Sequence, residues 1–84
     1  MATISSLSDF YAIADVAIRE CRHHGHHEIA DQLGEAKALG SSGLEIVGAI
    51  GAVFGKHSNV LKNLLGGEPV ENVRLFVQRC YRGF

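Results

Sequence analysis

The chain has 84 residues, of which 46% are apolar and 20% charged, and its net charge is −1 when the histidines are neutral. This length predicts a single domain, 1–84. The composition excludes a disordered chain, which needs low hydrophobicity and a high net charge. A net charge near zero also gives no global field that would attract nucleic acid or an anionic membrane, so we expect neither as a partner.

The start of the chain and its cysteines indicate a cytoplasmic protein. Met1-Ala-Thr-Ile-Ser-Ser lacks the basic start and apolar run of a secretory signal. The longest apolar run, 44–55, is interrupted by Glu45 and is about eight residues short of a membrane span. Cys21 and Cys80 are too few and too far apart for a disulfide framework or a zinc knuckle, so we expect buried, reduced thiols. A Cys21–Cys80 bridge stays open if the first and last helices pack together.

The first two predicted helices form an antiparallel hairpin. The first begins near Ser6 or Ser8, either of which can cap the amides of the first turn, and Gly25 ends it. Its apolar stripe is Phe10, Ile13, Ala14, Ala17, Ile18 and Cys21. The second helix spans residues 26–39 and ends at Gly40, with the inner stripe Ile29, Ala30, Leu33 and Ala36. A two-residue break between two short helices is typical of such a hairpin.

The third predicted helix, 44–54, opens with a capping box. In Ser42-Gly-Leu-Glu45, the serine hydroxyl would accept from the Glu45 amide and the glutamate side chain would return to the serine amide. The helix is apolar almost all round, which favours a place at the centre of the domain. Another side of it carries glycines, which weaken a helix by about 1 kcal/mol each. Close approach of a neighbouring helix would compensate for these glycines, Gly48, Gly51 and Gly55.

Two further segments complete the predicted bundle. The fourth spans 58–65 and ends at Gly66-Gly67, and the pattern does not decide whether it continues the third helix. The last helix begins at Pro69, where a missing amide costs nothing. Its apolar stripe is Val70, Val73, Phe76, Val77 and Cys80, and its outer face carries Arg74, Gln78 and Arg82. The sequence therefore predicts an all-α fold, a compact bundle of four to five short helices around the third helix.

Part of the chain resembles a family pattern. The segment Gly25-His-His-Glu-Ile-Ala-Asp-Gln-Leu-Gly-Glu-Ala, followed by Gly40-Ser-Ser-Gly-Leu-Glu-Ile-Val-Gly, is similar to small uncharacterised bacterial all-helical proteins with a Gly-Ser-Thr-Gly-x-Glu-Ile helix cap. Ser42 stands where threonine is commoner, and the apolar, glycine-rich residues 48–55 replace the long basic helix that often follows. The resemblance covers about a third of the chain. It implies a compact helical fold in a bacterium or its phage, and it implies no activity.

A histidine cluster between the first two helices suggests a metal site. His23-His24-Gly25-His26-His27 is followed by Asp31, and imidazole and carboxylate groups bind zinc or nickel. The metal site predicted from this pattern uses His24, His27 and Asp31. The alternative is a polar turn whose histidines are solvated. A third reading is a pH sensor, because these histidines would gain charge together below about pH 6.5.

Charge is unevenly distributed, and this pattern suggests a docking surface. Residues 1–42 carry six acids and three bases, whereas residues 43–84 carry three acids and five bases. Glu28, Asp31 and Glu35 form an acidic line on the second helix, with no lysine or arginine within it. We expect this line to bind a basic protein, since complementary charge speeds association and selects partners. The alternative is an ordinary solvated face.

No catalytic pattern emerges from the remaining polar residues. Ser41 and Ser42 lie in no nucleophile elbow, and Gly55-Lys56-His57-Ser58 lacks the spacing and the preceding strand of a phosphate loop. Arg74, Arg79 and Arg82 suit the end of a helix and make no aromatic-lined basic patch.

Taken together, these patterns predict a non-enzymatic protein-binding module without a cofactor. Its most specific form is a bacterial immunity or inhibitor protein that occludes a basic toxin or enzyme. The alternatives are a metal- or pH-responsive protein and a structural homo-oligomer, in which the third or last helix packs against its copy.

Overall fold

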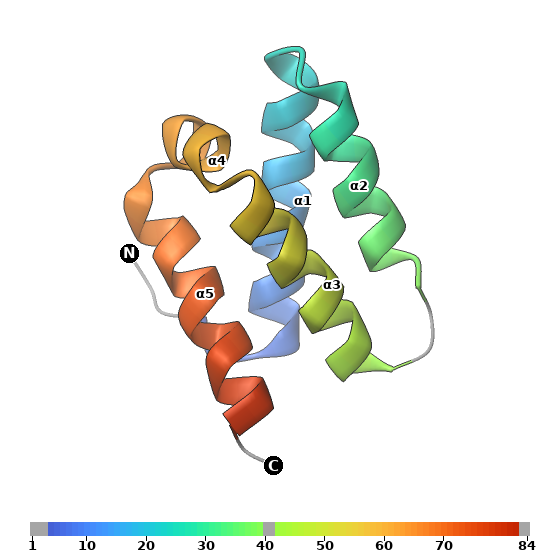
Figure 1. Ribbon diagram of the computed structural model, residues 1–84, viewed down its shortest axis with the longest axis vertical. Coiled ribbons are helices and arrows are strands. Elements are labelled where there is room, and N and C mark those ends of the chain that lie inside the picture. Colours follow the sequence, from blue (N-terminus) through green and yellow to red (C-terminus); the bar gives the residue numbers. More distant parts are fainter. Residues whose placement is uncertain (1–3, 40–41, 83–84) are drawn as a thin grey trace.

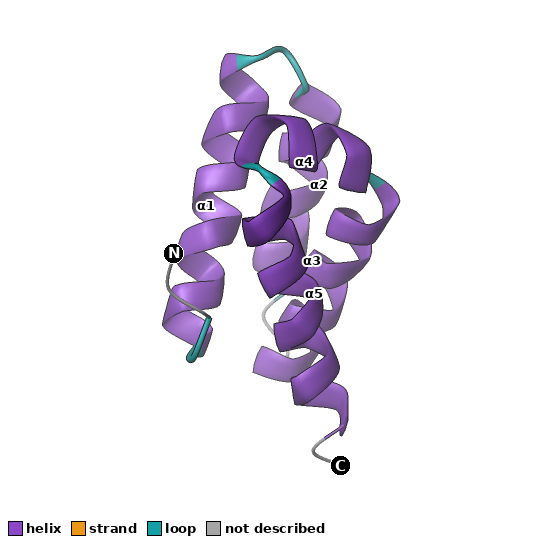
Figure 2. Cartoon of the chain, turned by 90° about the vertical axis from the view of Figure 1, so that its left-hand side faces the viewer, coloured by secondary structure: helices purple, strands orange, loops and turns teal. Residues whose placement is uncertain are grey.

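The computed structural model describes residues 4–39 and 42–82, and within them the chain folds into five α-helices and no strand (Figure 1). This confirms the predicted all-α bundle. The helices are α1 (Leu7–His23), α2 (His27–Lys37), α3 (Gly43–Lys56), α4 (Ser58–Leu65) and α5 (Gly67–Arg82). Figure 2 views the bundle from the side on which α4 and α5 lie, with the α1–α2 turn at the top.

The predicted hairpin of α1 and α2 is present. Ser6, and not Ser8, caps α1, because its Oγ accepts a hydrogen bond from the Asp9 amide at 3.2 Å. Gly25 makes the turn with a φ of 84°, a left-handed conformation that glycine adopts without the strain of a side chain. An ion pair between Lys37 and Asp15 joins the two helices at the opposite end of the hairpin. The prediction that Gly40 ends the second helix lies outside the described residues.

Helices α3 and α4 are separate, which answers the question that the sequence left open. Ser42 caps α3 by accepting from the Glu45 amide at 3.2 Å. Only this half of the predicted capping box forms between the two described residues. His57 is the single residue between α3 and α4, and its Nε2 lies 3.0 Å from Oε1 of Gln32 on α2. The junction is therefore tied to the hairpin.

Helix α5 begins two residues earlier than predicted. Gly66 has a φ of 94° and donates its amide to the Lys62 carbonyl at 2.8 Å, which closes α4. Gly67 then starts α5, so Pro69 lies within the first turn, where the missing proline amide still costs no helical hydrogen bond. Arg79 on α5 donates to the carbonyl of the buried Ile4 at 2.5 Å, which fixes the N-terminal segment against the bundle.

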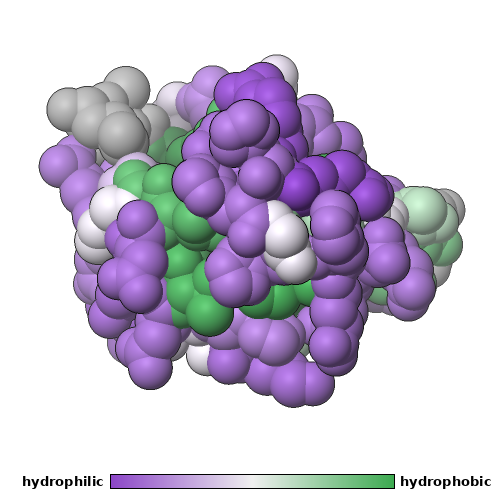
Figure 3. Space-filling view, turned by 90° about the horizontal axis from the view of Figure 1, so that it is seen from above, coloured by the Kyte–Doolittle hydropathy of each residue, from purple (hydrophilic) through white to green (hydrophobic). Residues whose placement is uncertain are grey.

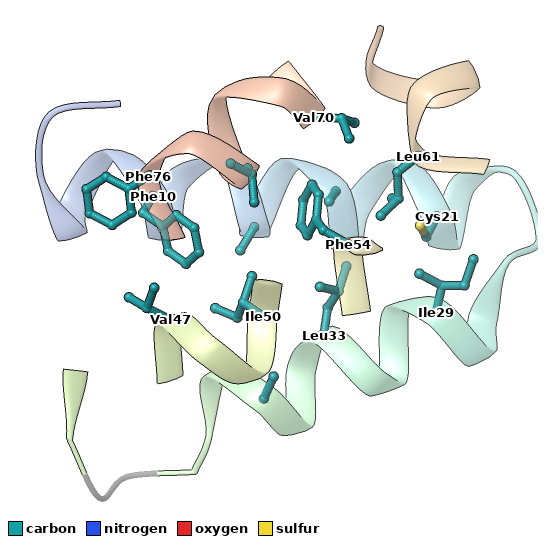
Figure 4. Packing of buried hydrophobic residues seen from close by; sticks show 14 of the residues in the cluster. Phe10, Cys21, Ile29, Leu33, Val47, Ile50, Phe54, Leu61, Val70 and Phe76 are labelled. Atoms are coloured by element: carbon teal, nitrogen blue, oxygen red, sulfur yellow. The ribbon is translucent and has the colours of Figure 1, made fainter. Parts of the chain in front are cut away.

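The hydrophobic core lies between α1 on one side and α2 and α3 on the other (Figure 4). Phe10 on α1 stacks on Phe76 of α5 with ring centroids 5.0 Å apart. The buried residues are Ile4, Phe10, Ala14, Ala17, Cys21, Ile29, Ala30, Leu33, Ala36, Val47, Ile50, Phe54, Leu61, Val70, Val73 and Phe76. They include eight of the ten stripe residues predicted for the first two helices, and the other two, Ile13 and Ile18, are half-buried against the core, which confirms those faces.

Helix α3 takes the central place that the sequence predicted, and three of the other four helices pack directly on it. Helix α3 packs against α2, α4 and α5, whereas α1 packs against α2, α4 and α5. The outward residues of α3, Glu45, Ala52 and Lys56, are exposed. The core therefore lies between α1 and α3.

Of the three α3 glycines that the sequence pattern singled out, two have the predicted role of admitting a neighbour. A Cβ atom on Gly48 would lie 2.1 Å from the Tyr81 hydroxyl oxygen, and one on Gly51 would lie 2.8 Å from Cγ2 of Val77. Tyr81 crosses Gly48 to donate to the Leu44 carbonyl at 3.0 Å. Gly55 is different, because nothing lies within 4 Å of the position that its Cβ would take.

We expect Gly51→Ala and Gly55→Ala to change stability in opposite directions. Alanine at position 55 gains about 1 kcal/mol of helix propensity without a clash. Alanine at position 51 gains the same propensity, but overpacking against the stiff Val77 side chain costs about 1–3 kcal/mol. Urea denaturation should show a stabilised Gly55→Ala variant and a destabilised Gly51→Ala variant. Equal stabilisation of both would contradict the close α3–α5 contact.

Candidate binding surfaces

The predicted acidic line lies on the outward face of α2. Glu28, Asp31 and Glu35 are all exposed, while Ile29 and Leu33 on the opposite face are buried in the core. Glu28 accepts a hydrogen bond from Gln32 Nε2 at 3.4 Å. Within the described residues, neither Glu28 nor Glu35 forms an ion pair. The hairpin therefore presents these carboxylates to solvent on a packed, rigid helix.

One cation lies closer to this face than the sequence indicated. Arg22 at the end of α1 pairs with Asp31, with Nη2 and Oδ1 3.5 Å apart. Both side chains are more than half exposed, and an exposed pair of this kind contributes only about 0–1 kcal/mol. The pair depends on how α1 and α2 align in the hairpin, so the spacing of acids along α2 alone could not reveal it.

The histidines do not assemble the predicted metal site. His24 lies 3.7 Å from the Glu20 carboxylate on its own helix, and its ring meets that of His23 edge-on with centroids 5.2 Å apart. Asp31 faces Arg22 instead. Nowhere in residues 4–39 and 42–82 do three His, Cys, Asp or Glu side chains gather to hold a metal ion. His24, His27 and Asp31 are thus not among any group of three possible ligands in the described residues.

Zinc should therefore leave the folded protein unchanged. If the folded protein bound zinc with a micromolar Kd, free zinc at a hundred times that Kd would raise its free energy of unfolding by about 2.7 kcal/mol. A thermal melt readily detects a change of this size. We expect about 100 µM zinc to leave the Tm of the untagged protein where it is. A rise in Tm that His24→Ala removes would contradict the arrangement seen here.

The two thiols are free and their predicted alternative, a bridge, does not form. Cys21 is fully buried near Leu61 and Ile29 (Figure 4), whereas Cys80 is half-buried on α5. Burial raises the pKa of the Cys21 thiol above its ordinary value, and the nearby Glu20 charge acts in the same direction. Cys21 therefore stays protonated and serves as a small apolar core residue.

A groove of about 400 Å³ lies where α3, α4 and α5 meet. Its apolar wall is formed by Phe54 of α3 and by Val70, Val73 and Val77 of α5, and Gly51 and Gly55 add no side chain on the α3 side. The volume falls within the range of about 300–1,000 Å³ that is typical of ligand pockets. Figure 3 shows the end of the bundle where α4 lies, and apolar side chains gather on the α4 side of that end.

The rim of this groove is charged. Arg74 forms a bidentate pair with Glu71, with N–O distances of 2.9 and 2.5 Å. This hydrogen bonding holds the pKa of the Glu71 carboxyl below its ordinary value, and the charge of Lys62 on α4 lowers it further. Lys62 itself forms no ion pair with a described residue. The rim thus carries two cations and one anion.

Sequence reasoning missed this groove because it needs three helices at once. A glycine inside a helix, such as Gly55, was a weak signal at best, because Gly34 inside α2 is just as unopposed and lines no groove. Lys62, Glu71 and Arg74 are unremarkable on their own helices, and only the fold places them around one hollow.

Comparison with protein-family models, curated proteins and solved structures finds no match to this chain. The resemblance to small bacterial helical proteins therefore stays a prediction. In the part of the chain that the structure describes, no helix is both long enough and apolar enough to cross a bilayer.

Proposed function

We propose that this protein is a non-enzymatic protein-binding module that occludes a basic partner, as a bacterial immunity or inhibitor protein does. The observation that carries the proposal is the outward face of α2, where Glu28, Asp31 and Glu35 are exposed on a helix whose other face is buried. We place the protein in the cytoplasm as part of this proposal, and its two free thiols suit that compartment.

The geometry of the hairpin suits recognition by charge. Buried Ile29 and Leu33 fix which way α2 faces, so the backbone that carries the three carboxylates is already in place when a partner arrives. A cation from the partner can replace Arg22 on Asp31 at small cost, because exposed pairs are weak. Negative charge on one face also accelerates encounter with a basic protein, and salt screens this attraction.

Native mass spectrometry tests this proposal most simply. The untagged chain, purified with the products of its neighbouring genes, should appear in a stoichiometric complex with a basic polypeptide. Glu28→Lys with Glu35→Lys should weaken that complex at least about tenfold, since like charges then face each other. Raising the salt concentration should weaken the wild-type complex in the same direction.

Glu45→Lys is the matched control. Glu28 and Glu45 each lie in the first turn of a helix, so a lysine at either position disturbs the helix dipole by a similar amount. The Glu45 variant should keep the partner. A complex that survives the double reversal on α2, or a chain that stays alone at micromolar concentration with those gene products, would sink the proposal.

A further inference from the structure

The groove between α3, α4 and α5 begins where the close contact between α3 and α5 ends. Helices α3 and α5 touch at Gly51 and Val77, where even a Cβ would collide. One turn further along α3, no atom lies within 4 Å of the position that a Cβ on Gly55 would take. The hollow that results is lined by buried or half-buried apolar residues of α3 and α5 and stays accessible from solvent.

Gly55 lowers the stability of α3 relative to alanine, and no close contact with another helix requires a glycine there. Gly48 and Gly51 each make room for a side chain of α5, and Gly55 makes room for none within the described residues. A side chain at position 55 would project into the groove, which Gly55 lines. Gly34 inside α2 is equally unopposed, but only Gly55 lines a groove, and the missing side chain leaves that groove open.

The charge around the groove selects the kind of occupant. Lys62 is exposed and unpaired among the described residues, and Arg74 meets Glu71 with both side chains about half exposed. A carboxylate from the occupant would lie near both cations, with Glu71 as the only anion among the lining residues. The groove therefore favours a ligand that combines apolar side chains with negative charge.

The length of the groove favours a helix. The apolar part of its α5 wall runs from Val70 to Val77, which spans about 10 Å at a rise of 1.5 Å per residue. This is two helical turns, the distance covered by apolar anchors at i, i+3 or i+4, and i+7 of an amphipathic helix. We propose that the groove binds an acidic amphipathic helical segment of a partner protein, with its apolar anchors over Gly55 and its carboxylates at Lys62 and Arg74.

This site is distinct from the acidic face of α2. Helix α2 lies at one edge of the bundle and α5 at the other (Figure 1), and the two surfaces carry opposite charge. One copy of the chain can therefore bind a basic partner at α2 and an acidic helix of another partner in the groove. The two proposals rest on different residues and can fail separately.

Fluorescence anisotropy with a designed probe tests the proposal. The probe is a labelled peptide of about sixteen residues, long enough to form a helix when bound, with leucines at i, i+4 and i+7 and glutamates beside them. A second probe carries lysines in place of the glutamates. The acidic probe should bind the wild-type protein at least about tenfold more tightly than the basic one.

Three variants locate the binding. Gly55→Leu should fill the groove and weaken the acidic probe at least about tenfold, and Gly55→Ala, which adds only one methyl group, should have an intermediate effect. Lys62→Glu should weaken the acidic probe by a similar factor and strengthen the basic one. Lys56→Glu is the matched control, because Lys56 and Lys62 each lie in the last turn of a helix and only Lys62 lines the groove.

The outcomes separate clearly. Loss of binding in Gly55→Leu, at unchanged helix content by circular dichroism, together with normal binding by Lys56→Glu and by Glu28→Lys, supports the proposal. It is overturned if neither probe binds at high micromolar concentration, if both probes bind equally, or if Gly55→Leu binds like the wild type. Binding of decanoate in place of the peptide, with the same sensitivity to Lys62→Glu, would also overturn it and assign the groove to a small amphiphile.

Discussion

The close contact between α3 and α5 is the constraint on which the rest of the molecule depends. Gly48 and Gly51 let Tyr81 and Val77 lie directly against the backbone of α3, and the Tyr81 hydroxyl ties the two helices through the Leu44 carbonyl. With α5 held there, Phe76 reaches Phe10 on α1 and closes the core. This antiparallel contact between α3 and α5 ends before Gly55, and the groove lies where it ends.

Charge follows the same division of the molecule. The α1–α2 hairpin turns its apolar stripes into the core, so Glu28, Asp31 and Glu35 lie on the outside of α2. There, Arg22 of α1 pairs with Asp31. On the other side, α4 and α5 place Lys62 and Arg74 around the groove. A chain with a net charge of −1 thus acquires two surfaces of opposite character. Fields of this local kind, and not the net charge, select a partner.

The sequence predicted the features that depend on neighbouring residues. The Ser42 cap, the turn at Gly25 and the buried stripe of α2 follow from local spacing, and the structure has all three. Pairing between elements was harder. The sequence could not show that Arg22 meets Asp31 or that Lys62 lies beside Glu71, because both depend on how separate helices align. It also could not show that one side of α3 is open to solvent, because apolarity does not tell whether a helix is covered on every side.

A double-mutant cycle on Gly51 and Val77 tests the central contact most directly. If the Val77 side chain is what a methyl group at position 51 would strike, Gly51→Ala should destabilise the wild type. In a Val77→Ala background, the same substitution should be neutral or stabilising. Urea denaturation of the four proteins gives the coupling free energy, and contacting residues typically show about 0.5–3 kcal/mol. A cost of Gly51→Ala that is the same in both backgrounds would mean that α3 and α5 do not meet at these residues.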